Sequence, residues 1–186
     1  MRLISLIKNA LDEVPQDYYH ISTTYCKEGI VRERVFCYEL YHRMRKIQDD
    51  NKCFQFHIHG EIDKSGHKLF ARKDRKNPDF IFHDPGRMEG NALIVEVKGT
   101  ITVQGVSKDL ETLKAFCSKY GYQQGLWILF NYNLEEAKRK LRNKIRNMGI
   151  EKYYDVAERI TILCKKAHGE RSEQINMSNL LAEIRG

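Results

Sequence analysis

The 186-residue chain has few of the features that mark membrane-spanning, disulfide-rich or low-complexity proteins. No apolar run approaches the roughly 18 residues that a membrane-spanning helix requires. The five cysteines are scattered without Cys-x-x-Cys spacing, which favours reduced thiols over a disulfide framework or a zinc site. With only three prolines and no linker or repeat, the sequence predicts one domain over residues 1–186. The N-terminus is too short and polar for a signal peptide, so a cytoplasmic protein is expected.

The composition indicates a globular protein with an excess of positive charge. Apolar residues make up 41% of the chain and charged residues 31%, which is compatible with a sizeable buried core. The formal net charge is +7. A basic balance is compatible with a polyanionic partner such as nucleic acid, although it also fits an ordinary soluble protein.

Hydrophobic periodicity predicts alternating helices and strands. The clearest helical stripe combines Phe36, Leu40, Met44 and Ile47, and two-residue alternation follows in the segment CFQFHIHGEI. Helices are expected at 1–13, 30–47, 107–120, 134–148 and 178–184, and strands at 53–62, 67–71, 79–83, 91–98, 125–131 and 160–164. This order predicts an α/β fold, a mixed central β-sheet flanked by helices on both faces.

Two acidic residues and a lysine stand at the ends of two of these strands. Pro78-Asp79 opens one strand, and after sixteen residues Glu96-Val97-Lys98 closes an apolar one. Side chains at i and i+2 of a strand share a face, so Glu96 and Lys98 project together. Two carboxylates can hold a hard divalent cation such as Mg²⁺, and a lysine beside them can position water or stabilise phosphate charge. The cluster therefore suits phosphodiester cleavage.

The Glu-x-Lys spacing alone is weak evidence, because Glu136-Ala137-Lys138 repeats it in a polar helix. Each charged residue taken singly fits an ordinary surface salt bridge. The strand context is more specific, since adjacent charges at the end of a buried strand are costly unless they are paired, metal-bound or at a cleft. A third acidic residue, Glu39, lies beside Leu40 at the edge of the helical stripe and is expected to reach the sheet.

Glu39 on a leading helix, then Pro78-Asp79, then Glu96-Val97-Lys98, then a helix and an apolar strand, resembles the PD-(D/E)xK, or restriction-endonuclease-like, nuclease superfamily. The resemblance covers roughly residues 30–131. It implies a restriction-endonuclease-like αβββαβ core, with residues 132–186 as a C-terminal extension. Members are mostly Mg²⁺-dependent nucleases of restriction, repair, recombination and phage defence.

The resemblance also implies roles for individual residues. Asp79 and Glu96 would be metal ligands together with the Val97 carbonyl, and Lys98 would hold the attacking water or the scissile phosphate. Glu39 would bind the metal through water or hold a neighbouring group. The cofactor would be Mg²⁺, with Mn²⁺ as a substitute, and the reaction would be endonucleolytic hydrolysis of DNA by metal-activated water, with RNA left open.

Basic residues provide candidate nucleic-acid contacts in three places. The loop before Pro78 carries Arg72, Lys73, Arg75 and Lys76, Lys108 lies on the helix after the motif, and Lys138 and Arg142 lie on the basic helix 134–148. Weaker candidates for the site are Glu61 and Asp63, as auxiliary ligands or a solvated hairpin end. His57 and His59 share a strand face that could bind a metal or be an ordinary exposed polar face, and His83 could point into the cleft.

Two other functions stay open on the sequence. The same fold could be a catalytically silent nucleic-acid-binding module, or a partner-binding subunit in which the charged strand end is incidental. A homodimer or a separate specificity subunit is plausible for a nuclease of this size.

Overall fold

The computed structural model describes residues 3–50, 56–61 and 77–186. The strand expected at 67–71 and the basic residues Arg72, Lys73, Arg75 and Lys76 lie outside the described residues, as does Asp63. No helix within the described ranges is long and apolar enough to cross a membrane.

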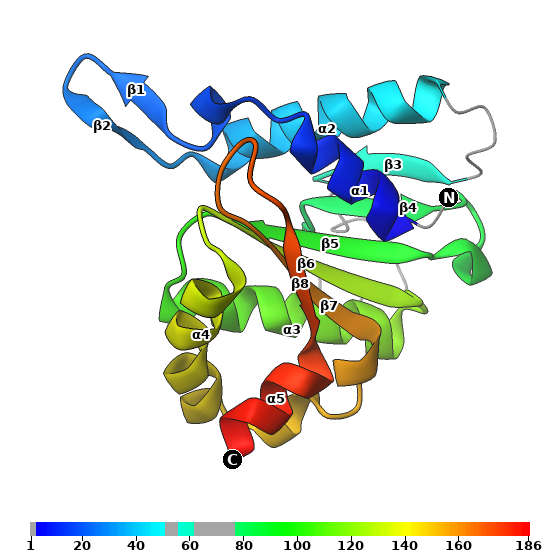
Figure 1. Cartoon of the computed structure of the whole chain (residues 1–186). Coiled ribbons are helices and arrows are strands. Elements are labelled where there is room, and N and C mark those ends of the chain that lie inside the picture. The colour runs from blue at the N-terminus through cyan, green and yellow to red at the C-terminus, as the bar shows by residue number, and fades with distance from the viewer. Residues whose placement is uncertain (1–2, 51–55, 62–76) are drawn as a thin grey trace.

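The described residues form a six-stranded mixed sheet in the order β3-β4-β5-β6-β7-β8 (Figure 1). The first three strands are an antiparallel meander, β5, β6 and β7 are parallel, and β8 is antiparallel to β7. The strands are β3 (His57–Gly60), β4 (Phe80–His83), β5 (Leu93–Lys98), β6 (Gln124–Phe130), β7 (Ile160–Lys165) and β8 (Glu173–Asn176). Because β5 and β6 run parallel, their carboxyl ends meet at one edge of the sheet.

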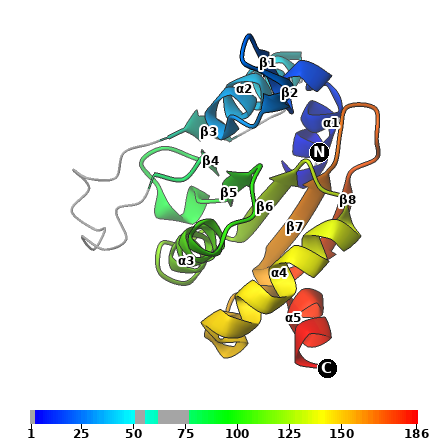
Figure 2. The same ribbon diagram turned by 90° about the vertical axis from the view of Figure 1, so that its left-hand side faces the viewer.

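Helices cover both faces of this sheet (Figures 1 and 2). One apolar cluster joins α1 and α2 to the side chains of Phe80, Val95 and Val97, and the other joins α3, α4 and α5 to Ile81, Ile94 and Trp127. The helices are α1 (Leu3–Asp12), α2 (Glu33–Asp50), α3 (Val103–Lys119), α4 (Leu134–Met148) and α5 (Met177–Arg185), with short 3₁₀ turns at Gln16–Tyr18, Met88–Gly90, Ile150–Tyr153 and Ala157–Arg159. The mixed α/β architecture is therefore as expected.

Local signals outside the apolar stripes account for the differences from the expected elements. The helix predicted from residue 107 begins at Val103, because the hydroxyl of Thr102 accepts the N–H of Gly105 at 3.1 Å and caps it. The helix predicted from residue 30 begins at Glu33, after a hairpin of β1 (Ile21–Thr23) and β2 (Cys26–Ile30). This hairpin projects from the body (Figure 1), and its strands, like β8, were not predicted.

A close approach at Gly99 joins the start of α2 to the end of β5. A Cβ atom on Gly99 would overlap the ring of Phe130 and the side chain of Val31. The N–H of Gly99 also donates to Glu33 Oε1 at 3.1 Å. Glycine at this position lets Val31 and Glu33 lie directly against the strand end, because no side chain separates the two backbones.

We expect Gly99→Ala to lower the free energy of unfolding by about 1–3 kcal/mol, the usual cost of overpacking a filled core. Urea unfolding followed by circular dichroism measures the change. Gly60→Ala is the matched control, because the nearest atom to its Cβ would be 3.4 Å away, an ordinary contact. Equal stability of wild type and Gly99→Ala would contradict the close approach.

Candidate functional site

Asp79 and Glu96 lie side by side across two antiparallel strands. Phe80 pairs with Val95, so the residue before Phe80 falls beside the residue after Val95. The backbone N–H of Val97 donates to Asp79 Oδ2 at 2.6 Å, which fixes the carboxylate against β5. Strand alternation points Glu96 to the α3 face of the sheet, the side on which Ile94 is buried. Asp79 stands directly before β4, so its carboxylate lies at the strand end.

Glu96 is a buried carboxylate with an unused acceptor. The residue is 2% exposed, and its Oε1 finds no hydrogen-bond partner among the described residues. Burial raises the pKa of Glu96 well above its ordinary value, and the negative charges of Asp79 and Asp109 raise it further. Burial also raises the pKa of Asp79 to about 6, against the lowering effect of the Val97 hydrogen bond. Two neighbouring acids of raised pKa are typical of a functional site.

Lys98 is held between two carboxylates from helices on opposite faces of the sheet. Its Nζ lies 3.1 Å from Glu33 Oε2 on α2 and 3.4 Å from Asp109 Oδ2 on α3. Burial lowers the pKa of Lys98, but Asp109 and Glu33 outweigh that effect and raise it above its ordinary value. The side chain is only 11% exposed. The ammonium group is therefore charged and fixed in position beside Glu96.

Asp109 is a second buried acid that the sequence analysis missed. Its Oδ2 accepts the Nε1–H of Trp127 at 3.2 Å, and its Oδ1 has no partner within the described part of the chain. Burial raises the pKa of Asp109. A signal existed in the sequence, because Asp109 falls on the apolar stripe of Val106, Leu110 and Leu113, where a charge is out of place. Glu33, the other missed residue, had no such signal.

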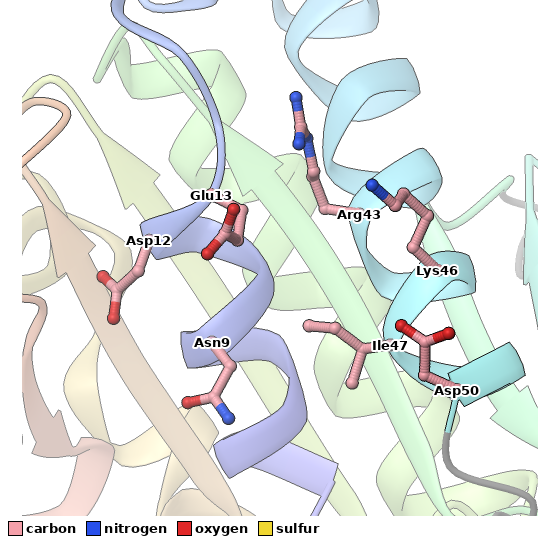
Figure 3. A pocket seen from close by; sticks show the side chains of 7 residues that line it. All are labelled: Asn9, Asp12, Glu13, Arg43, Lys46, Ile47 and Asp50. Carbon is pink, nitrogen blue, oxygen red and sulfur yellow. The ribbon is translucent and has the colours of Figure 1, made fainter.

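Glu39 does not join this cluster. Its Oε1 pairs with Arg43 Nε at 2.6 Å. At about 100° per residue, Glu39 projects roughly 160° away from Cys37 on the helix, and Cys37 is the α2 side chain that senses the charges of Asp79 and Glu96. Arg43 also lines a pocket between α1 and α2 (Figure 3). The Glu39–Arg43 pair is thus largely buried on the side of α2 turned away from Cys37, and Glu33 is the acidic α2 residue that contacts the end of β5 among the described residues.

The weaker candidates are distributed around the site. Lys108 is exposed on α3, and its charge lowers the pKa of both Asp79 and Glu96. His59 Nδ1 lies 2.7 Å from His83 Nε2 on the neighbouring strand. Glu61 pairs with Arg34 at 3.0 Å at the end of β3.

The basic helix α4 begins at the same edge of the sheet as the site, directly after β6. On it, Lys138 is neutralised by Glu135 at 3.2 Å and Glu183 at 2.9 Å. Arg142 is exposed. Of the two α4 residues predicted to contact nucleic acid, Arg142 is thus the more accessible.

The donor set fits a hard cation that keeps most of its water. Within the described ranges, no three His, Cys, Asp or Glu side chains are arranged to hold a metal ion alone. Mg²⁺ typically needs only one or two carboxylates, with waters and substrate phosphates completing its octahedron. Asp79 and Glu96, whose Oε1 has no partner in the part of the chain that the structure describes, supply two carboxylates.

We expect Asp79→Asn to raise the free energy of unfolding at pH 8 in metal-free buffer. The pKa of Asp79 is about 6 in the folded protein and 3.8 in its unperturbed state, so between these values the folded form holds a proton that the unfolded chain has lost. Wild-type stability therefore falls as pH rises through this window, by about 3 kcal/mol in full, and stays low above pH 6. Urea unfolding at pH 4, 6 and 8 measures the gain of the variant.

Glu136→Gln is the control of opposite sign, because the hydrogen bond with Lys166 lowers the pKa of Glu136. A gain for Asp79→Asn that is as large at pH 4 as at pH 8 would show that its charge is not the cause.

Comparisons with models of known protein families, with curated proteins and with solved structures gave no match. No relative therefore lends this chain an activity. The side chains around Glu96 are the basis on which its function is inferred.

Proposed function

We propose that the protein is a Mg²⁺-dependent nuclease that hydrolyses phosphodiester bonds of DNA on a restriction-endonuclease-like core. The observation that carries the proposal is the buried Oε1 of Glu96, which has no hydrogen-bond partner among the described residues. Glu96 lies beside Asp79 and two residues before a fixed Lys98. A buried carboxylate oxygen without a hydrogen-bond partner lowers the stability of the fold unless a cation or a proton compensates the charge. The pair on neighbouring strands suits a divalent cation.

The order of elements supports the proposal. Among the described residues, α2, β3, β4, β5, α3 and β6 follow in this order, which agrees with the αβββαβ order that the resemblance implies. Within this unit β3, β4 and β5 are antiparallel, and β6 is parallel to β5. Asp79 directly precedes the second of these strands and Glu96 lies on the third, which agrees with the order of the motif.

A divalent cation held by Asp79, Glu96 and the Val97 carbonyl would supply positive charge to the oxygens of the scissile phosphate. Asp79 and Glu96 would bind and orient it, and its positive charge would offset the burial and the neighbouring negative charges that raise the pKa of both acids. In the proposed reaction, water attacks the phosphorus in line with the leaving oxygen.

Within the described part of the chain, Lys98 keeps one N–H donor that no acceptor uses. An ammonium group carries three donors, and among the described residues two acceptors, Glu33 and Asp109, lie within hydrogen-bonding or ion-pair range. The third donor can hold the attacking water or a phosphate oxygen. Because the two acceptors come from α2 and α3, Lys98 keeps its direction without help from the substrate, which limits the reorganisation that reaction requires.

The exposed basic residues of α3 and α4 would bind the phosphate backbone. Lys108 lies close enough to affect both acids, and Arg142 lies on the helix that begins at the same edge. Such contacts are independent of sequence and weaken as salt rises. We assign these phosphate contacts to substrate affinity and not to the cleavage step.

We expect Asp79→Asn, Glu96→Gln and Lys98→Met each to reduce Mg²⁺-dependent DNA cleavage at least about 100-fold, because each removes a charge or donor that acts on the reacting phosphate. Gel assays on plasmid and linear DNA with Mg²⁺ or Mn²⁺ measure it. Glu136→Gln is the matched control, because it alters the second Glu-x-Lys in a capping box that glutamine can also form. Undiminished cleavage by Glu96→Gln would refute the site.

Thermal unfolding with Mn²⁺ separates the nuclease from its silent alternatives. Ion binding to the folded state alone raises the melting temperature, so wild type should respond and Glu96→Gln should not. Salt-sensitive DNA binding without metal response or turnover would favour a catalytically silent module.

We further expect Asp109→Asn to lower kcat about tenfold with little change in KM, because Asp109 acts by positioning Lys98. Combining it with Lys98→Met should cause no further loss, whereas independent roles would give additive losses. Trp127 is the only tryptophan of the chain, so its fluorescence reports directly on the Asp109 contact. Asp155→Asn, which breaks an exposed pair with Lys114, is the control.

A further inference from the structure

A pocket of about 490 Å³ opens beside Asp79, one of the candidate metal ligands. It lies between α2 and the adjoining ends of β3 and β4, and its lining includes Tyr38, Tyr41, His59, Phe80 and Asp79. Its volume falls within the roughly 300–1,000 Å³ typical of ligand pockets. The pocket and the proposed cleavage site therefore share one residue, Asp79.

The wall of this pocket is aromatic and partly fixed in place. The rings of Tyr41 and Phe80 are nearly parallel, at 15° with centroids 6.2 Å apart, and the hydroxyl of Tyr41 donates to the carbonyl of Ile58 at 3.2 Å. Tyr38 differs, because it is 62% exposed. A large ring exposed at the rim of an aromatic pocket is a ready stacking partner for a planar ligand.

The position of Asp79 restricts which planar ligand would reach the pocket. In the proposed nuclease, Asp79 takes part in binding at the scissile phosphate, so a group in this pocket belongs to the nucleotide at or next to that phosphate. The planar part of a nucleotide is its base. In duplex DNA that base is stacked and paired, and removing it costs a few kcal/mol, whereas an unpaired base enters at much lower cost.

We propose that this pocket binds one unstacked nucleobase of the substrate against Tyr38, so that the enzyme selects single-stranded or locally unpaired DNA. The inference rests on the proposed nuclease function and names its substrate class. Stacking on an aromatic side chain tolerates any base, because every base has a π-face. The pocket therefore gives selectivity for strandedness and not for sequence.

A cycle that removes the ring and the base in turn tests the proposal. Cleavage of single-stranded oligonucleotides is measured with wild type and Tyr38→Ala, on intact DNA and on a series with one abasic position. Tyr38→Ala should lower kcat/KM on intact single strands by roughly 5- to 150-fold, the range that stacking of one base supplies. On the oligonucleotide whose abasic position lies next to the cut, Tyr38→Ala should have the same kcat/KM as wild type, because the base that Tyr38 would stack on is already absent.

Two variants serve as controls. Tyr38→Phe keeps the ring and should retain wild-type cleavage. Tyr154→Ala removes another exposed tyrosine, which lines a separate pocket with Leu181 and Ala182, and should also have no effect. Additive losses at every abasic position, or an equal loss on duplex and single-stranded DNA, would overturn the proposal.

A binding measurement keeps the pocket and the nuclease function distinguishable. A single-stranded oligonucleotide that carries 2-aminopurine is titrated with protein in EDTA, where no cleavage is required. The base site is supported if wild type and Tyr38→Phe quench the fluorescence of 2-aminopurine and Tyr38→Ala quenches it at least fivefold less. This result supports the site even if no turnover is found. Equal quenching by all three proteins overturns the base site, whatever the cleavage assays show.

Discussion

The burial of Glu96 is the constraint on which the rest of the site depends. A carboxylate that is taken out of water without a full set of partners costs several kcal/mol, and here Asp79 and Asp109 add negative charge close by. The sheet holds this arrangement because β5 is a central strand whose neighbours and covering helices are well packed. The packing of the apolar core thus offsets the cost of a charged cluster that is unfavourable by itself. Such a local cost is common at functional sites.

Around this constraint, two helices on opposite faces of the sheet hold the same lysine. Glu33 reaches Lys98 from the first turn of α2, and Asp109 reaches it from α3. The α2 contact requires the bare backbone of Gly99, which leaves no side chain between strand and helix. Trp127 then links Asp109 to the next parallel strand. The end of β5 is therefore a junction of both layers, and a change in either helix would affect the direction of Lys98.

Much of the fold, and part of the site, could be predicted from periodicity. The apolar stripe of α4 and the run of β5 each identify an element, and the two-residue period places Glu96 and Lys98 on one face. Glu39 lies apart from the contacts of Lys98 for a physical reason. A helical stripe shows which side of α2 is buried, but not that α2 covers the sheet face opposite Glu96. Glu33, at the start of the helix, is the α2 acid that contacts Lys98 among the described residues.

The sequence by itself determined the strands that carry Asp79, Glu96 and Lys98 and the order of elements that surrounds them, because these follow from local patterns of polarity. The tertiary structure alone decided the partners of these residues. Strand register brought Asp79 beside Glu96, and helix packing brought Glu33 and Asp109 to Lys98. The hydrogen bonds of Asp79 with Val97 and of Glu33 with Lys98 join residues that are 18 and 65 positions apart in the sequence. They therefore depend on how the layers pack and not on the pattern within any single segment.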